Sequence, residues 1–283
     1  MKNFSKVKAL ALDLDGTILL PDNSLSLYTV DILQRCMARG LKIILCTGRS
    51  SEASEKYRAA IGATGPMVFF NGAEIADAPI RKEGNPPQYP ALLPLEVVDF
   101  CVDLSRKMDV YFQAYFPETN VPRLVTEKID AEWEMYFKHT GTPPSVSDIK
   151  EALKTPGLAG AIKGMFITDF ETQEKIRPFL IERFGNSVYV TRTLVTFLEI
   201  MANGISKGTG LKRALDRMGI GVDETIAFGD EENDLPMFTV AGFSVAPANA
   251  KEKVRLAADV VVRSNVEDGV AMFLEEQFLH CQA

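Results

Sequence analysis

Residues 7–17 read VKALALDLDGT, and this stretch decides the fold. Its first part, Val7–Leu14, is a short apolar run that ends in acidic residues, which is typical of a buried strand in a parallel sheet. Asp13 and Asp15 lie two residues apart, so both can turn toward one site where the strand ends. Ligands of open α/β sheets bind outside the carboxyl ends of the strands. The stretch therefore predicts an α/β fold with a site beside its first strand.

The following segments alternate between helix and strand. The spacing of apolar residues and the helix start and stop signals predict helix, strand, helix and strand at Leu25–Arg39, Leu41–Cys46, Ser50–Ile61 and Met67–Phe70. Asn71-Gly72 then predicts a tight turn into a return strand, Ala73–Ala76. An alternation of strands and helices of this kind is typical of a right-handed parallel sheet.

The composition changes after this first part. Glu83–Pro94 (EGNPPQYPALLP) holds four prolines and a glycine, which is typical of a linker. Beyond it the predicted strands and helices fit an α+β domain. The α/β pattern returns with helix Lys207–Met218 and strand Thr225–Phe228. We therefore expect a parallel-sheet core, residues 1–83 plus 200–283, interrupted by an inserted α+β domain, residues 84–199.

The composition of the 283 residues is that of a soluble globular protein, with 46% hydrophobic and 24% charged residues. The net charge of −7 disfavours broad nucleic-acid binding, which needs a basic face. No apolar segment approaches the roughly 18 residues that span a bilayer, and the four cysteines show no C-x-x-C spacing. We expect a cytoplasmic protein with reduced thiols and with neither nucleic-acid nor membrane partners, either a monomer or a weak homodimer.

A second acidic cluster, Gly229–Asp234 (GDEEND), follows the predicted strand Thr225–Phe228. It would lie at the same edge of the sheet as Asp13 and Asp15. Carboxylates gathered at such an edge bind a hard cation through oxygen, and Mg²⁺ typically takes few carboxylates together with phosphate oxygens. The two clusters therefore indicate a magnesium site that handles phosphate.

Two further signals suit an anion. Thr47-Gly48-Arg49 follows the second predicted strand and opens a helix, where a hydroxyl and free backbone N–H groups can hold phosphate. Lys207 stands at the start of another helix, where the macrodipole disfavours a cation, so a bound anion would explain its placement. With these groups one carboxylate can attack phosphorus, and a second can protonate the leaving oxygen and then activate water.

Taken in chain order, Asp13-Leu14-Asp15-Gly16-Thr17, Thr47-Gly48-Arg49, Lys207 and Gly-Asp-x-x-Asn-Asp at 229–234 resemble the four motifs of the haloacid dehalogenase (HAD) superfamily. Phe70-Asn71-Gly72-Ala73 and Gly204–Gly208 make the sequence most similar to the Cof-type sugar-phosphatase branch. The resemblance covers roughly the first 80 and last 85 residues. It implies a Rossmann-like core, and it implies by position that the inserted domain is a mobile cap.

The resemblance also implies a role for each matching residue. Asp13 would be the nucleophile, and Asp15 the general acid and base. Mg²⁺ would be bound by Asp13, Asp230 and the backbone carbonyl of Asp15, with Asp234 supporting this shell. The phosphate would be held by the Leu14 backbone N–H and by Thr47, Gly48, Lys207 and Asn233.

These roles imply a Mg²⁺-dependent phosphatase that hydrolyses phosphomonoesters of small metabolites, either a sugar phosphate or a phosphorylated cofactor, through an aspartyl-phosphate on Asp13. Two alternatives stay open. One is a phosphotransferase or mutase that moves the phosphoryl group between sugar hydroxyls. The other is a non-catalytic protein that binds a phosphorylated ligand. A signalling receiver is disfavoured, because receivers are compact single domains and this chain has an insertion.

Overall fold

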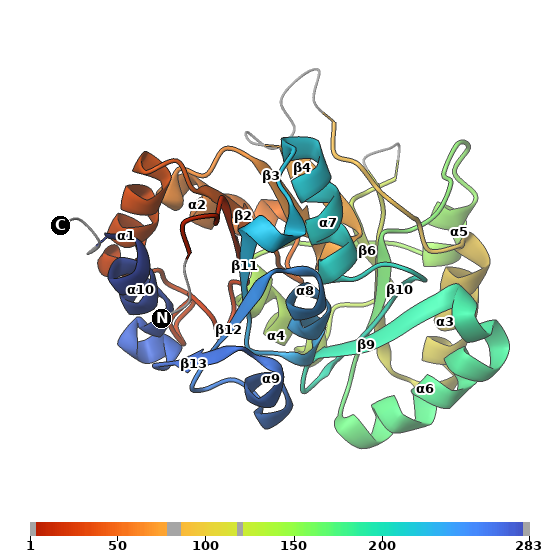
Figure 1. Ribbon diagram of the computed structural model, residues 1–283. Helices are drawn as coiled ribbons and strands as arrows, with labels where there is room; N and C mark the ends of the chain where they lie inside the picture. Colours follow the sequence, from red (N-terminus) through yellow and green to blue (C-terminus); the bar gives the residue numbers. More distant parts are fainter. Residues whose placement is uncertain (1–3, 78–85, 118–120, 280–283) are drawn as a thin grey trace. The chain divides into compact units, whose positions relative to one another are not determined.

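The computed structural model describes residues 4–77, 86–117 and 121–279 (Figure 1). The chain divides into two compact units, one formed by Met1–Gln88 with Ser206–Ala283 and the other by Tyr89–Ile205. The boundary expected at residue 199 falls inside strand β10 (Phe197–Ala202), which pairs with strands on both sides, so the second unit runs on to Ile205. Residues 83–85 of the expected linker lie outside the described residues.

A parallel five-stranded sheet forms the centre of the first unit, as the sequence predicted. Its order is β13-β12-β11-β1-β2, with bounds Val260–Val262, Phe243–Pro247, Thr225–Phe228, Ala9–Leu12 and Lys42–Leu45. Strand β1 lies between β11 and β2, and Leu12 is in register with both Phe228 and Leu45. The segments that follow these three strands therefore meet at one edge of the sheet.

Helices cover both faces of this sheet (Figure 1). Helices α7 (Lys207–Met218) and α8 (Leu235–Val240) pack against Ala9 and Ala11 of β1. Gly208 lets α7 approach α8 closely, because a Cβ at this position would overlap the backbone of α8. On the other face α1 (Leu27–Ala38) lies beside α10 (Gly269–Leu274). The remaining helices of this unit are α2 (Ser51–Ile61) and α9 (Glu252–Ala257).

The third predicted strand departs from the parallel sheet. Strand β3 (Pro66–Phe69) forms the parallel bridge Cys46–Val68 just beyond the end of β2, and it pairs antiparallel with β4 (Glu74–Asp77). The predicted turn between them is present as a short 3₁₀ helix, Phe70–Gly72, whose three residues all have positive φ. Such a left-handed run is rare for non-glycine residues, and it turns the chain back beside the end of β2.

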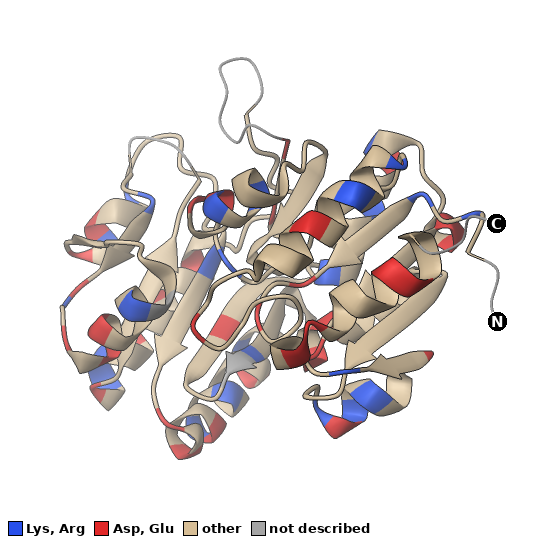
Figure 2. Ribbon diagram, turned by 90° about the vertical axis from the view of Figure 1, so that its left-hand side faces the viewer, with Lys and Arg blue, Asp and Glu red and all other residues tan. Residues whose placement is uncertain are grey.

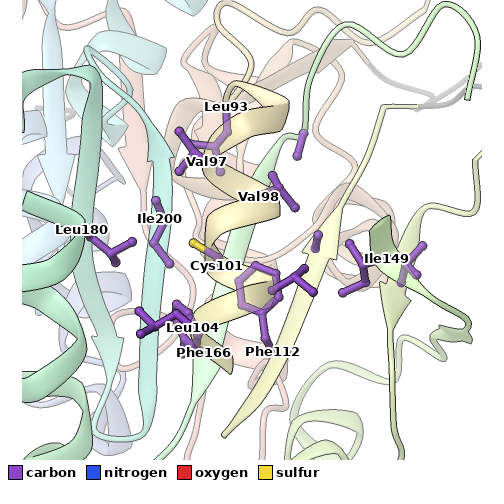
Figure 3. Packing of buried hydrophobic residues seen from close by; sticks show 14 of the residues in the cluster. Leu93, Val97, Val98, Cys101, Leu104, Phe112, Ile149, Phe166, Leu180 and Ile200 are labelled. Atoms are coloured by element: carbon purple, nitrogen blue, oxygen red, sulfur yellow. The ribbon is translucent and has the colours of Figure 1, made fainter. Parts of the chain in front are cut away.

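A mixed six-stranded sheet forms the second unit. Its order is β7-β6-β5-β8-β10-β9, with bounds Ser145–Val146, Leu124–Thr126, Tyr111–Tyr115, Lys163–Ile167, Phe197–Ala202 and Val188–Leu194. Helices α3 (Leu95–Met108) and α6 (Phe170–Phe184) share one apolar core with this sheet (Figure 3). Two short helices complete the unit, α4 (Ala131–Thr140) and α5 (Ile149–Leu153). Strand β7 and helix α5 were not predicted from the sequence.

Buried polar side chains lie on the strands of the second unit. On β5, Phe112 joins the apolar core, whereas Gln113 accepts a hydrogen bond from Tyr111. Lys163 on β8 and Glu199 on β10 form a buried ion pair at 2.5 Å. The strand alternation of β5 therefore separates an apolar face from a polar one.

The described residues contain no helix long and apolar enough to cross a membrane. Cys36, Cys46 and Cys101 are buried free thiols, and Cys281 lies outside the described residues. Acidic and basic residues are interspersed along the helices in the view of Figure 2. The net charge of −7 is thus not gathered into one acidic region on the side that this figure shows.

Candidate active site

Asp13 directly follows β1 and is 4% exposed. Its backbone N–H donates to the carbonyl of Phe228 on the neighbouring strand, which extends the sheet by one residue. The chain then turns sharply at Gly16, whose φ is +72°. A Cβ at Gly16 would overlap the carboxylate of Asp230, so only glycine permits this close approach.

The loop after β11 supplies two further carboxylates. Asp230 accepts a hydrogen bond from Thr17 Oγ1 at 2.9 Å, which ties this loop to the turn after β1. Asp234 Oδ2 accepts the backbone N–H groups of Asp230 and Glu231, both at 3.0 Å. Asp234 thereby fixes the path of its own loop.

Lys207 joins the two loops. Its Nζ lies 2.6 Å from Asp13 Oδ1 and 2.6 Å from Asp234 Oδ1, and its side chain is 1% exposed. Burial alone would lower the pKa of Lys207, but the two carboxylates outweigh this effect and raise it. The sequence analysis expected an anion beside Lys207 because of its position at a helix start. In the structure Asp13 and Asp234 provide this negative charge.

Asp13, Asp230 and Asp234, which we call the carboxylate cluster, have ligand oxygens within 4.8 Å of one another. Burial, opposed by Lys207 and reinforced by the neighbouring acids, raises the pKa of Asp13 well above its usual range. Burial and the charge of Asp234 raise the pKa of Asp230 to about 7. Three buried carboxylates around one ammonium leave an excess of negative charge, which a cation would offset.

Asp15 lies outside the carboxylate cluster. Its carboxylate accepts two hydrogen bonds from Arg49, at 2.8 Å from Nε and 2.5 Å from Nη2. The Asp15 side chain is 33% exposed, whereas that of Arg49 is 4% exposed. The sequence placed Asp15 in the site but did not predict this partner.

Thr47 lies beside the same sheet edge, because it follows β2. Its Oγ1 accepts the N–H of Arg49 at 3.1 Å, and its own N–H donates to Val68. Helix α2 begins only at Ser51, with Ser50 as its cap. Contrary to expectation, the backbone N–H groups of Thr47 and Arg49 are thus already used within the protein.

Asn71 is a residue that the sequence analysis used as part of a turn and of a family motif, but did not assign to the site. Its Oδ1 accepts a hydrogen bond from Asn233 Nδ2 at 2.9 Å, and a Cβ on Gly48 would lie 3.2 Å from it. Asn233 Oδ1 is buried and has no hydrogen-bond partner among the described residues. The available signal in the sequence was the Asn71-Gly72 pair, which favours the positive φ that Asn71 adopts.

The structure brings together most of the residues that the sequence singled out. Asp13, Lys207, Asp230 and Asp234 are joined by direct contacts. Leu14 lies in the turn after β1, where its carbonyl accepts the N–H groups of residues 17, 18 and 19. Asn233 is linked to the segment that follows β2 through Asn71, whose N–H donates to the carbonyl of Thr47.

Residues 10–274 match the haloacid dehalogenase-like hydrolase family. The chain is 32% identical over 281 residues to 5-amino-6-(5-phospho-D-ribitylamino)uracil phosphatase YitU of Bacillus subtilis, covering 97% of this chain and 98% of that protein. It is 23% identical to pyridoxal phosphate phosphatase YbhA of Escherichia coli, covering 94% and 97%. A solved haloacid dehalogenase-like hydrolase from Bacteroides thetaiotaomicron has a TM-score of 0.83 and 28% identity, covering 96% and 100%.

The family match spans nearly all of the chain, and it includes both motifs that build the carboxylate cluster and the lysine between them. The resemblance that the motifs indicated is thereby confirmed, as is the α/β fold with a parallel-sheet core. This chain belongs to the haloacid dehalogenase-like hydrolase family.

Proposed function

We propose that this protein is a Mg²⁺-dependent phosphatase that hydrolyses phosphomonoesters of small metabolites through an aspartyl-phosphate on Asp13. The observation that carries the proposal is the contact of Asp13 with Lys207 inside the carboxylate cluster. Relatives named for phosphatase activity on a phosphorylated ribitylaminouracil and on pyridoxal phosphate support the substrate class. We take this class to be sugar phosphates or phosphorylated cofactors.

The hydrogen bonds of the cluster favour Asp13 as the nucleophile. Asp234 is fully buried, and both its oxygens are held by Lys207 or by backbone N–H groups. Asp230 is bound by Thr17 on one oxygen. Asp13 accepts its hydrogen bond from Lys207 on Oδ1, and we assign its Oδ2 as the oxygen that attacks phosphorus, following the resemblance.

The donor set fits a hard divalent cation, because it consists of oxygens that carry an excess of negative charge. In the proposed site Asp13, Asp230 and the backbone carbonyl of Asp15 would hold Mg²⁺, and Asp234, which accepts a hydrogen bond from Lys207, would support these ligands. When bound, the ion offsets the negative charge that gathers on the phosphoryl oxygens. The attack on phosphorus and the proton transfers are carried out by side chains of the protein.

The reaction then has two transfers. Asp13 Oδ2 attacks phosphorus, and the bond to the ester oxygen breaks while Asp15 gives that oxygen a proton. Asp15, now a carboxylate, takes a proton from water as the water oxygen attacks phosphorus. Phosphate leaves with the water oxygen, and Asp13 returns as a carboxylate. Lys207 and the phosphate-binding groups named from the motifs, namely the Leu14 N–H, Thr47, Gly48 and Asn233, hold the phosphoryl oxygens throughout.

We assign the second unit, Tyr89–Ile205, the role of a cap that excludes water during the first transfer, following the resemblance. Its composition does not identify the metabolite. The cytoplasm is the proposed location, and a monomer or weak homodimer the proposed state.

Phosphate release from a panel of phosphorylated metabolites tests the proposal, with Mg²⁺ and with EDTA. Asp13→Asn should abolish release, because an amide attacks phosphorus poorly. Asp216→Asn is the matched control, since Asp216 is an exposed aspartate on α7. Release that persists in Asp13→Asn would refute the nucleophile. Transfer to a sugar hydroxyl without release would indicate a phosphotransferase instead.

A further inference from the structure

Arg49 makes a two-pronged contact with Asp15 that the roles above do not use. Nε and Nη2 of the guanidinium donate to the two carboxylate oxygens of Asp15. A planar fork of this kind fixes both the position and the rotation of a carboxylate, which a single hydrogen bond does not. Asp15 is therefore held in one orientation although a third of its side chain is exposed.

Arg49 is itself anchored by residues away from the carboxylate cluster. Its Nη2 also donates to Asn23 Oδ1 at 2.6 Å, and its guanidinium lies 5.5 Å from the centre of the Tyr57 ring. The Tyr57 hydroxyl in turn donates to the backbone carbonyl of Asn23 at 2.9 Å. The guanidinium is thus held by Asn23 and Tyr57 in addition to Asp15.

We propose that Arg49 is a positioning residue that holds the Asp15 carboxyl group in the orientation from which it gives its proton to the leaving oxygen. The inference rests on the proposed function, because it takes Asp15 as the general acid and base. In this proposal Arg49 acts on catalysis through the two hydrogen bonds that it donates to Asp15.

This role has a signature that a purely structural role lacks. A general acid accelerates the loss of a poor leaving group, such as an alkoxide, by about 10²–10⁴-fold. An activated leaving group such as p-nitrophenolate departs without a proton. Loss of positioning should therefore slow alkyl and phenyl phosphates much more than p-nitrophenyl phosphate.

The experiment compares Arg49→Lys with Arg58→Lys on three substrates: the best alkyl phosphate of the panel, phenyl phosphate and p-nitrophenyl phosphate. Arg58, on the helix α2 that begins two residues after Arg49, is the matched control. It donates the same pair of hydrogen bonds to Glu55, also at 2.8 and 2.5 Å. Lysine keeps the charge but cannot form the fork. For Arg49→Lys we expect kcat on the alkyl phosphate to fall at least about tenfold more than on p-nitrophenyl phosphate.

Asp15→Asn should show the same ordering of substrates with larger losses, and Arg58→Lys should leave all three rates unchanged. If Arg49→Lys unfolds below the assay temperature, Tyr57→Phe replaces it, because this change removes only the hydroxyl that donates to Asn23. We expect Tyr57→Phe to reduce kcat less than Arg49→Lys would, with the same ordering of substrates. Equal losses on all three substrates, or none, overturn the inference and leave the proposed function standing. A wild-type protein that releases no phosphate overturns the proposed function, and the inference with it.

Discussion

Replacing Lys207 with methionine tests the electrostatics of the site, because methionine keeps much of the side-chain length but removes the charge. Lys207 is 1% exposed and lies 2.6 Å from both Asp13 and Asp234. Removing one partner from a buried ion pair costs about 3–5 kcal/mol, since the other charge stays buried. For a unit of this size that loss lowers the melting temperature by roughly 6–20 °C.

The loss should depend on pH in a defined direction. Lys207 lowers the pKa of Asp13 and Asp230 against the effect of burial, so without it both pKa values rise further. A carboxyl group whose pKa rises on folding makes its full contribution to stability when the pH is below the pKa of the unfolded state. This contribution is lost as the pH rises through the pKa of the folded state. The difference between variant and wild type should therefore be larger at about pH 8 than at about pH 5.5.

The assay is urea denaturation in EDTA at both pH values, with Lys212→Met as control. Lys212 is an exposed lysine on the same helix, and surface substitutions usually change stability by less than about 0.5 kcal/mol. Two results would refute the reasoning. One is a Lys207→Met loss no larger than that of the control. The other is a loss that grows as the pH falls.

Three further predictions concern the metal, the first turn and the second unit. Mg²⁺ should stabilise the folded state by about 2.7 kcal/mol at 100 times its Kd, and a thermal-shift titration should show most of this effect missing in Asp230→Asn. Gly16→Ala should cost at least about 1 kcal/mol in urea denaturation and reduce phosphate release, because of the positive φ and the overlap with Asp230. Lys163→Met should cost about 3–5 kcal/mol in the same assay because Glu199 stays buried, whereas Lys163→Met with Glu199→Leu should recover most of it.

The location of the site followed from local patterns and one rule of topology. Asp13 ends one apolar run and Asp230 follows another, and parallel strands place such ends at a common edge. The rule applies here because β1 lies between β2 and β11 in the sheet. Lys207 was assigned to the site by a different argument, its unfavourable position at a helix start, and its partners came from the structure.

The pairings of side chains could not be predicted in the same way. Arg49 and Asp15 are 34 residues apart, and nothing in the spacing of either motif selects one partner over another. Asn71 contacts Asn233 because residues 70–72 take positive φ, which a pattern of apolar residues does not report. The hairpin of β3 with its return strand was predicted, but only the structure shows that β3 belongs to a separate two-stranded sheet and not to the parallel one.

The two acidic groups of the proposed mechanism differ in access to water, and the difference matches their roles. A nucleophile needs no exchange of protons with solvent, and Asp13 is 4% exposed beside a buried ammonium that favours its charged form. A general acid and base gives up one proton and takes another from water in each cycle, so it needs contact with solvent. Asp15 keeps a third of its side chain exposed while Arg49 fixes its orientation. An exposed Asp15 carboxylate without a fixed partner would rotate freely. The two hydrogen bonds from Arg49 prevent this rotation in the proposed mechanism.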